Sequence, residues 1–373
     1  MAEKIGVLLP RATDYPSIGF DLLDGIRLGL KQSGTEAAFI TENIGFGENQ
    51  SLNYAKAEKL IMEDNVSMIV VYASAAIAEP LFGLMEAADR PIIVLDANMT
   101  YTSASASPVA YHISLQGLEA CRLSGTRAAL GGKKVLMAGS FYEGGYRGNY
   151  AMVQGIQEGD GEVMGYYVSG YKISEFNIDS YRELISKQIA DSVCACFSVY
   201  LTGLFTEALK KAGPEFVSLP FYCSPFMAEE IILQEADFPG GTFEVIVPWA
   251  TGLPGKIQKS FLDEVRKLKQ KEANLFHLLG WEAGVTIPRI LAQGASSLSN
   301  WSFESPRGTV TFHPGTHYTY APLHECRIIE GKNGKCALEF VRTLPPDEAL
   351  HERSYHDKPE GATASWKNNY LCI

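Results

Sequence analysis

The chain has 373 residues, of which 46% are hydrophobic and 20% are charged. This composition is typical of a globular protein and excludes extensive disorder. The length favours two lobes over one compact domain. The formal net charge of −11 makes nucleic acids and anionic membranes poor partners.

The N-terminal part alternates continuous apolar runs with segments of helical period. The runs are 5–9, 37–41, 67–72, 91–95 and 109–113. Between them, apolar residues recur at helical spacing from Phe20 to Leu30, and a second helix is expected over 51–64. Continuous apolar strands that alternate with amphipathic helices predict a parallel sheet covered on both faces.

A second series of the same kind follows. Its strands are expected at 133–138, 162–168, 193–197, 220–223 and 243–247, with helices at 145–158, 178–190, 202–212 and 225–235. Two long helices then follow in succession, 256–270 and 274–291, and Pro288 should kink or end the second. The C-terminal part is β-rich, with strands at 308–312, 320–330 and 335–341. We expect the polar tail after Pro346 to be loosely held.

These elements predict an α/β protein of two doubly wound parallel-sheet lobes. In such sheets ligands bind beyond the carboxyl ends of the strands, which makes the cleft between the lobes the expected site. Lobe 1 is expected to comprise 1–115 and 251–325, lobe 2 116–250 and 326–345, and the C-terminal tail 346–373. The hinge would have three crossings, near 114–117, 248–252 and 324–328.

Other features of the sequence bear on location and metals. No apolar stretch reaches the roughly 18–20 residues that span a bilayer, and no basic segment or cleavage site precedes the first strand. The chain is then either cytosolic or a mature export product. The cysteines are read as buried free thiols, with a Cys326–Cys336 disulfide as the lesser alternative. His313 and His317 are read as a turn, because Pro314 and Gly315 between them exclude a helical metal-ligand pair.

Catalytic motifs are missing from the sequence. No Gly-x-Gly-x-x-Gly follows the first strand, and no P-loop or Gly-x-Ser-x-Gly elbow is present. We therefore expect no enzyme, no cofactor and no metal, and an enzyme on a doubly wound fold is kept as the remote alternative.

Four segments resemble a known family over 3–342. They are the first strand with Gly19–Gly29, Tyr72-Ala73-Ser74, the loop 139–149, and the run Ser305-Pro306-Arg307-Gly308 continuing to His317-Tyr318-Thr319-Tyr320-Ala321-Pro322. The layout is similar to the leucine/isoleucine/valine-binding-protein receptors of ABC transporters, which have the type I periplasmic-binding-protein fold. The C-terminal run resembles the branch with urea-binding receptors and the cytosolic amide sensor, as a signature of fold and not of ligand contact.

The resemblance and the strand ends together give the candidate ligand-binding residues. They are Ser17, Ile18, Tyr72, Ala73, Ser74, Asp96, Ala97, Asn98, Thr100, Tyr142, Tyr146, Tyr200, Thr202, Ser224 and Phe226. Ser74 is read either as a ligand contact or as a plain helix N-cap, and Pro80 suggests a later helix start near Glu79. Asp96 is read either as a partner for a ligand N–H or as an Asx-turn.

The leading interpretation is a receptor that closes around a small polar solute, such as an amino acid, an amide or a urea-like compound, and presents it to an ABC-transporter membrane permease. Such a receptor is periplasmic or extracytoplasmic and lipid-anchored, with a signal segment absent from this chain. A cytosolic sensor of the same fold, which controls a regulatory partner, is the alternative if the chain is full length. Family receptors for branched-chain amino acids carry an acidic residue where this chain has Ser224-Pro225-Phe226. That departure weakens a standard α-amino-acid ligand.

Overall fold

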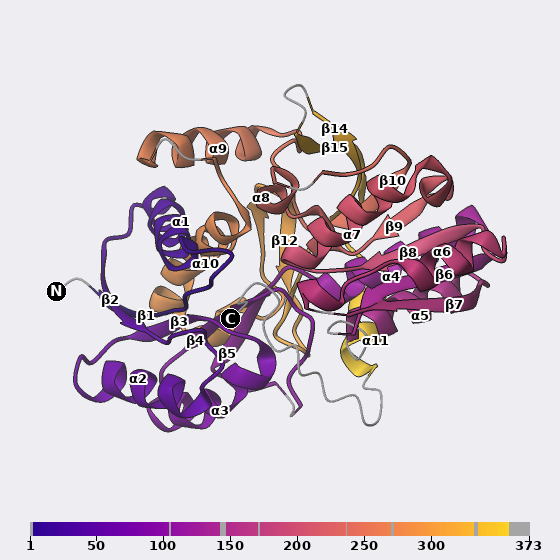
Figure 1. The fold of residues 1–373 in the computed structure, drawn as a ribbon. Helices are drawn as coiled ribbons and strands as arrows, with labels where there is room; N and C mark the ends of the chain where they lie inside the picture. The colour runs from indigo at the N-terminus through magenta and orange to yellow at the C-terminus, as the bar shows by residue number, and fades with distance from the viewer. Residues whose placement is uncertain are drawn as a thin grey trace.

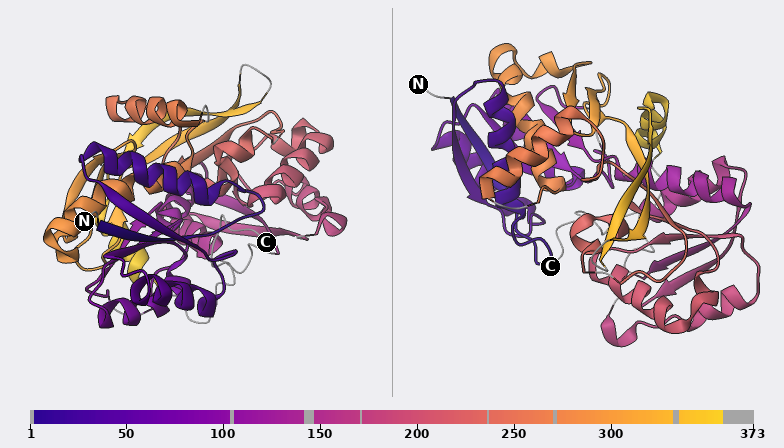
Figure 2. Two further views of the ribbon diagram at one scale, coloured as in Figure 1. Left: turned by 90° about the vertical axis from the view of Figure 1, so that its left-hand side faces the viewer. Right: turned by 90° about the horizontal axis from the view of Figure 1, so that it is seen from above.

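The computed structural model describes residues 3–103, 106–141, 147–170, 172–235, 237–269, 272–331 and 335–357. They form two halves, each built on its own twisted sheet, and the view from above separates the halves most clearly (Figures 1 and 2). The two-lobed α/β architecture expected from the sequence is confirmed.

The first half is built on a five-stranded parallel sheet with the order β2-β1-β3-β4-β5. Its strands are β1 (Glu3–Leu9), β2 (Ala37–Asn43), β3 (Met68–Tyr72), β4 (Ile92–Asp96) and β5 (Ala110–Ser114). Helices α1 (Ile18–Gln32) and α10 (Leu275–Gln293) lie on one face, and α2 (Gln50–Met62) and α3 (Ala75–Ala87) lie on the other (Figure 1). Both faces are apolar, as continuous buried strands require.

The second half is built on a seven-stranded sheet with the order β15-β14-β10-β9-β8-β6-β7. Its parallel strands are β6 (Lys134–Ser140), β7 (Glu162–Ser169), β8 (Ser192–Cys196), β9 (Phe221–Cys223) and β10 (Phe243–Val247). The strands β14 (Leu323–Glu330) and β15 (Cys336–Leu344) extend it in antiparallel fashion. The helices that follow the parallel strands are α5 (Arg147–Glu158), α6 (Asp179–Ser186), α7 (Val199–Ala212) and the short α8 (Glu230–Leu233).

Further elements connect the two halves. Helix α4 (Gly117–Gly131) follows β5 and packs against α5, and α9 (Lys256–Lys269) leads from β10 back to α10. A small sheet of β11 (Ser302–Ser305), β12 (Gly308–Phe312) and β13 (Thr319–Tyr320) attaches to β5 by the bridge between His112 and Tyr318.

The two interior prolines sit inside continuous helices. Of the two outcomes expected at Pro288, a kink or a helix end, the end is wrong, because helix α10 runs through this proline to Gln293. Helix α3 begins directly at Ala75, and the alternative start near Glu79 is wrong as well. Pro80 has no N–H for the carbonyl of Ala76 one turn earlier. The side chain of Gln50 donates a hydrogen bond of 3.0 Å to that carbonyl instead, which satisfies it from helix α2.

The segment after Pro346 is ordered as helix α11 (Glu348–His356), so the expectation of a loosely held tail is wrong for these residues. His351 is buried between the two halves: its Nδ1 lies 3.1 Å from the Glu119 carboxylate on α4, and its Nε2 lies 2.9 Å from the Thr316 hydroxyl beside β13. Asp357 accepts a hydrogen bond from Tyr150 on α5. Helix α11 therefore contacts elements of both halves.

Candidate functional site

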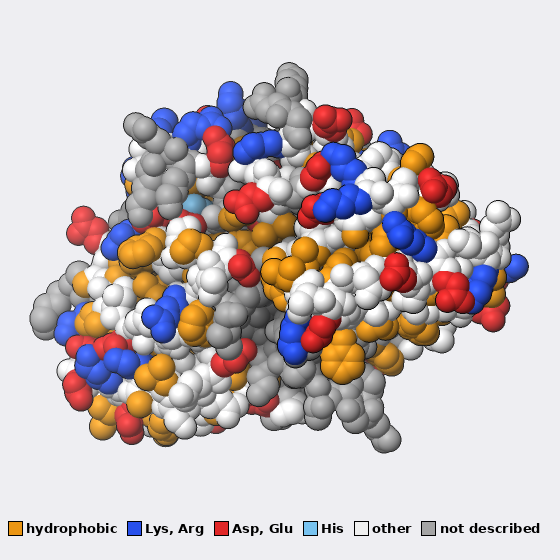
Figure 3. Space-filling model, in the orientation of Figure 1, with side chains coloured by type: hydrophobic (Ala, Val, Ile, Leu, Met, Phe, Trp, Pro, Cys, Tyr) orange, Lys and Arg blue, Asp and Glu red, His pale blue; other side chains and the backbone are white. Residues whose placement is uncertain are grey.

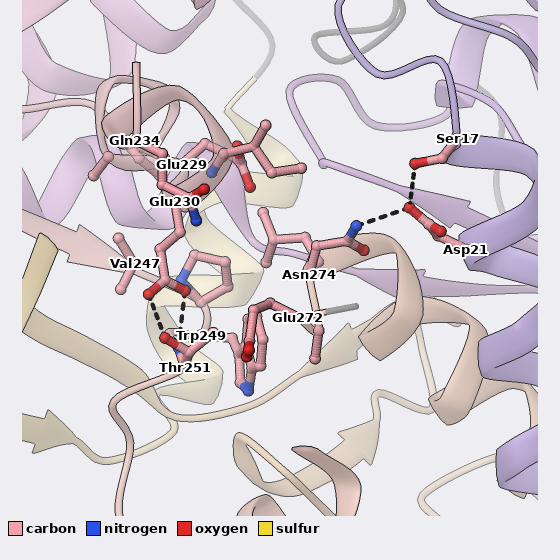
Figure 4. Close-up of a pocket in the computed structure, with 16 residues that line it drawn as sticks. Ser17, Asp21, Glu229, Glu230, Gln234, Val247, Trp249, Thr251, Glu272 and Asn274 are labelled. Carbon is pink, nitrogen blue, oxygen red and sulfur yellow. Dashed lines mark hydrogen bonds between the residues drawn. The ribbon is translucent and has the colours of Figure 1, made fainter. Parts of the chain in front are cut away.

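A cavity of about 370 Å³ lies between the two halves. Ser17, Asp21, Asn274 and Leu275 line it from the first half, and residues of 225–234 and 247–251 line it from the second. Figure 4 shows Ser17, Asp21 and Asn274 on one side of this cavity and Glu229 and Glu230 on the other. In the space-filling view, the surface is hollowed between the two halves (Figure 3).

The first wall is a hydrogen-bonded group at the start of α1 and α10. Ser17 Oγ donates to Asp21 Oδ2 over 2.7 Å, and Asn274 Nδ2 donates to the same oxygen over 2.9 Å. Asn274 Oδ1 in turn accepts from the backbone N–H groups of Phe276 and His277, which caps helix α10. The wall thus consists of groups whose geometry is fixed by secondary structure.

Glycines bring the two helices of this wall close enough for that contact. A Cβ atom on Gly25 of α1 would lie 2.2 Å from the carbonyl oxygen of His277, and one on Gly280 of α10 would lie 2.1 Å from that of Leu22. Without side chains at these crossing points, α1 and α10 pack backbone against backbone. This packing places Asp21 beside Asn274.

The second wall departs from the expected helix over 225–235. The structure has a 3-10 turn, Pro225–Ala228, then an extended Glu229, then α8. Glu229 Oε2 accepts hydrogen bonds from the backbone N–H groups of Ile231 and Ile232. The continuous-helix prediction is wrong because the Glu229 side chain caps a new helix, which requires extended backbone at its own position.

Two carboxyl groups of the second wall are withdrawn from water. Glu229 is 4% exposed, and burial raises its pKa to about 7 against the opposing backbone hydrogen bonds. Burial also raises the pKa of Glu230, whose carboxylate accepts from the backbone N–H and the hydroxyl of Thr251. Trp249 also lines the cavity, and its Nε1 donates a hydrogen bond to Oε1 of Gln258.

A second cavity of about 440 Å³ adjoins the first at Ile231. Thr13 and Asp14 line it from the first half, and Tyr200, Gly203, Ile232 and Glu235 line it from the second. Among the candidate ligand-binding residues, Ser17 therefore lines the first cavity and Tyr200 the second.

The candidates after β3 are buried at the strand end. Tyr72 packs edge-on against Phe276, and the Ala73 N–H bonds to the carbonyl of Leu95. Ser74 occupies the N-cap position of α3, but its hydroxyl caps nothing and has no hydrogen-bond partner in the described part of the chain. The reading of Ser74 as a plain side-chain cap therefore does not hold.

The candidates after β4 are tied to the first crossing. The carbonyls of Ala97 and Asn98 accept from the N–H groups of Gly117 and Leu118, which are unsatisfied donors at the start of α4. The Asp96 carboxyl lies fully buried, and neither of its oxygens has a hydrogen-bond partner among the described residues, so the reading as an Asx-turn has no hydrogen bond behind it. Burial raises its pKa well above the usual range, and the nearby Glu119 adds to this rise. Thr100 supplies a carbonyl to the Asn98 amide.

The remaining candidates are distributed as follows. Thr202 and Ser224 are fully buried after β8 and β9, and neither hydroxyl has a hydrogen-bond partner within the described ranges. Phe226 and Ile18 are buried in the core. Tyr142 and Tyr146 lie outside the described residues. Neither cavity is lined by the hydroxyls of Ser74, Thr202 or Ser224 within the part of the chain that the structure describes.

Sequence reasoning missed Asp21, Glu229, Glu230 and Asn274. Asn274 carried a signal, since an asparagine before an apolar helix is a typical N-cap. Glu229 and Glu230 carried none, because they fit the polar face of an amphipathic helix. Asp21 is polar in the first turn of a helix, where acidic residues are common without any ligand.

The C-terminal signature has a structural role. Arg307 is buried and forms a two-pronged ion pair with Glu282 of α10, with Nε–Oε1 and Nη2–Oε2 distances of 2.7 and 2.9 Å. His317 Nδ1 lies 2.9 Å from the carbonyl of Ser107, and the Tyr318 ring stacks on that of His112. The signature thus joins β12 and β13 to the first half.

The described residues bear on the expectations about a metal site, the Cys326–Cys336 pair and membrane-spanning helices. These residues contain no group of three or more His, Cys, Asp or Glu side chains that could hold a metal ion. Cys326 and Cys336 are both free thiols. No helix in the described part of the chain has the length and apolar character that crossing a membrane requires.

Comparisons with known proteins agree with this fold. The model of the periplasmic binding protein family matches residues 3–335. An ABC-transporter substrate-binding protein from Sphaerobacter thermophilus is similar in structure, with a TM-score of 0.79 and 19% identity over 92% of this chain and 98% of that chain. No curated protein sequence matches the chain.

Two further structures show the range of the fold. A solute-binding protein from Rhodopseudomonas palustris HaA2, in complex with p-hydroxybenzoic acid, has a TM-score of 0.74 and 18% identity over 92% of this chain and 97% of that chain. A leucine-binding protein from Thermotoga maritima MSB8 has a TM-score of 0.66 and 14% identity over 93% and 99%. With the family model matched over almost the whole described chain, the protein belongs to the periplasmic binding protein family, whose members compared here are solute-binding proteins of ABC transporters and not enzymes.

Proposed function

We propose that this chain captures a small polar solute, namely an amino acid, an amide or a urea-like compound, between its two halves and delivers it to an ABC-transporter permease. The observation that carries this proposal is a set of buried polar groups at strand ends from both halves. The hydroxyls of Ser74, Thr202 and Ser224 are buried without hydrogen-bond partners among the described residues. Buried polar groups are normally hydrogen-bonded, and exceptions call for an explanation.

The loop after β4 of the first half lies against the start of α5 in the second half, near the end of β8. A Cβ atom on Gly148 of α5 would contact the Met99 side chain, from the loop after β4, and the sulfur of Cys196 at the end of β8. A solute held between these ends would contact both halves at once, and such contacts favour a closed form over an open one. The proposed lobes are 1–115 with 251–325 and 116–250 with 326–345.

The solutes that similar proteins bind support a small organic solute but not one chemical class. The proteins compared above bind p-hydroxybenzoic acid in one case and leucine in another. The C-terminal signature resembles the amide and urea branch in fold only, so amino acids, amides and urea-like compounds all remain candidates. We place the protein outside the cytoplasm, either in the periplasm or held at the membrane by a lipid anchor.

A thermal-shift screen of the full chain tests the proposal. The panel contains the common amino acids, aliphatic and aromatic amides, urea, amines, guanidinium compounds, benzoates and aliphatic carboxylates. We expect one chemical class to raise the melting temperature, and calorimetry with that compound to give one site per chain. Small-angle scattering should then show a smaller radius of gyration with the compound than without it. A flat response to the whole panel, or turnover of a bound compound, would contradict the proposal.

A further inference from the structure

Two carboxyl groups lie near each other where the chain first crosses between the halves. Asp96 is the last residue of β4 in the first half, and Glu119 lies in the first turn of α4, which packs against α5 of the second half. Both side chains are buried. Backbone hydrogen bonds join the loop after β4 to the start of α4. A rotation of α4 relative to β4 would therefore change the surroundings of both carboxyls.

Hydrogen-bond donors are placed at Glu119 and not at Asp96. Glu119 Oε1 accepts a hydrogen bond of 2.6 Å from the Tyr101 hydroxyl and lies 3.1 Å from Nδ1 of His351. Both oxygens of Asp96, and Oε2 of Glu119, have no hydrogen-bond partner among the described residues. Buried polar groups are normally hydrogen-bonded, so three such oxygens in one place call for an explanation.

Most titratable groups around the pair bring no charge to it. The rings of Tyr318 and Tyr355 pack edge-on against Tyr101, and His112 stacks on Tyr318. Burial raises the pKa of the Tyr101 and Tyr318 hydroxyls, and of the Cys121 thiol on α4, well above their usual ranges. Burial lowers the pKa of His112 to about 3. These four side chains are therefore neutral near pH 7.

The positively charged side chains nearby are engaged elsewhere. Arg122, one turn further along α4, pairs with Glu158 and with Asp357. Arg147 at the start of α5 donates to the backbone carbonyl of Asp357, and within the described ranges it forms no ion pair with either buried carboxyl. His351 supplies a counter-charge only when its ring is protonated. The two carboxyls thus lack a permanent positive partner in the part of the chain that the structure describes.

Two negative charges buried near each other without a counter-charge are costly, and one carboxyl of such a pair keeps its proton. Burial raises the pKa of Asp96 well above its usual range, and the negative charge of Glu119 adds to this rise. Since the donors serve Glu119, Asp96 is the carboxyl that retains the proton. This holds only while the pair stays dry, because water that reaches Asp96 would stabilise its charged form.

We propose that Asp96 and Glu119 form a proton-operated latch between the two halves. A proton on Asp96 favours the arrangement that buries the pair, and loss of this proton favours an arrangement in which water reaches it. Acid therefore favours the assembled halves, and base favours their separation. A solute held between the halves favours the assembled arrangement too, so its affinity should fall as pH rises. Only this last effect rests on the proposed function.

The ligand-free chain tests the latch directly. At about pH 7, infrared spectra of the parent chain and of Asp96→Asn should differ by the band of one protonated carboxyl group. From about pH 5 to about pH 9, the radius of gyration of the parent chain, measured by small-angle scattering, should grow, while Asp96→Asn keeps one value. Glu58→Gln, at an exposed position of α2, should behave like the parent chain. Absence of the band, a constant radius in the parent chain, or equal growth in Asp96→Asn would overturn the proposal.

Glu119→Gln gives an independent variant that keeps an acceptor for the Tyr101 hydroxyl. Without the neighbouring charge, Asp96 should lose its proton at a lower pH, so the radius should depend on pH less than in the parent chain. A dependence as strong as that of the parent chain would count against the pair. Added calcium, magnesium or sodium ions should leave the radius unchanged. If they reproduce the effect of acid, the buried oxygens hold a cation and the proposal is wrong.

A solute from the screen that does not titrate in this range tests the coupling to binding. Its association constant should fall by up to about tenfold per pH unit above about pH 5. Asp96→Asn should abolish this slope, whatever it does to the affinity itself. A pH-independent affinity in the parent chain would overturn the coupling and leave the proposed function standing. A flat response to every compound would contradict the proposed function, and the infrared and scattering results on the ligand-free chain would still decide the latch.

Discussion

Asn274 donates a hydrogen bond to Asp21, a residue 253 positions earlier in the chain, and so closes one wall of the cavity. The contact exists because α1 and α10 cross with their backbones almost touching. The wall is therefore a consequence of helix packing, and substitutions at the crossing of α1 and α10 should alter the geometry of the cavity.

The first prediction concerns that crossing. Gly25→Ala should destabilise the protein by about 1–3 kcal/mol or more, because the new Cβ would lie 2.2 Å from the backbone oxygen of His277. A backbone atom cannot move aside by changing rotamer, as a side chain can. Gly83→Ala, in the interior of α3 with no neighbouring atom within 4 Å, should instead stabilise by about 0.5–1 kcal/mol. Urea unfolding measures both. Equal effects at the two glycines would refute close packing of α1 and α10.

The second prediction concerns the buried hydroxyls. Ser224→Ala and Ser74→Ala should leave the unfolding free energy of the ligand-free protein unchanged, or raise it by up to about 1 kcal/mol, because each removes a buried donor without a partner. Ser124→Ala is the matched control, since its buried hydroxyl donates to the carbonyl of Cys223. That variant should lose about 1 kcal/mol. If Ser224→Ala is as destabilising as Ser124→Ala, the Ser224 hydroxyl has a structural partner.

The sequence was sufficient to predict the two sheets. Their strands are continuous apolar runs bounded by turns. A parallel sheet covered on both faces requires such runs, because every position of its strands is buried. Strand ends such as Ser74 and Ser224 could be placed for the same reason. The helix over 225–235 was wrong because apolar spacing continues across Glu229, while one side-chain cap breaks the backbone there.

The cavity itself could not be predicted from local patterns. Asp21 and Asn274 meet because glycines let two distant helices pack closely. Nothing in the sequence around either residue indicates this contact. Helix α11 was missed for a similar reason. His351 and Tyr355 look polar or amphipathic in the chain, and their burial depends on partners such as Glu119 and Tyr101, more than 200 positions away.

The third prediction concerns the buried ion pair of Arg307 and Glu282. Arg307→Ala should cost about 3–5 kcal/mol, because it leaves the Glu282 carboxylate buried without a counter-charge. The double variant Glu282→Met with Arg307→Met removes both charges and should be markedly more stable than Arg307→Ala. Chemical denaturation of the three proteins decides this. A double variant as unstable as the single one would show that the pair acts through shape and not through charge.

The fourth prediction uses the pKa of Glu229, which burial raises from 4.5 to about 7. Between these pH values the folded protein keeps a proton that the unfolded chain has lost, so this carboxyl lowers stability progressively as pH rises through the window. Glu229→Gln lacks the effect. Relative to the parent chain, the variant should therefore gain roughly 3 kcal/mol from pH 4.5 to pH 8, with most of the gain before pH 7. Urea unfolding at several pH values gives this difference, and Glu58→Gln should show none. A pH-independent difference for Glu229→Gln would contradict the buried position of this carboxyl.

The fifth prediction concerns helix α11, which bridges the two halves through His351. The ring is buried and lies within hydrogen-bond distance of both Glu119 on α4 and Thr316 beside β13. His351→Ala should cost about 1–3 kcal/mol, since it leaves buried polar groups with fewer partners on both sides. His356→Ala, on the exposed end of the same helix, should change stability by less than about 0.5 kcal/mol.

Hydrogen exchange locates the effect of that substitution. If α11 joins the halves, His351→Ala should speed exchange in α4 and in the turn before β13 together, while α2 and α3 keep their protection. Exchange that increases in α11 alone would mean that the helix rests on the surface without linking the two halves. Because α11 contacts both halves, the same variant should also change the radius of gyration of the ligand-free protein, and scattering from the two proteins at equal concentration measures that change.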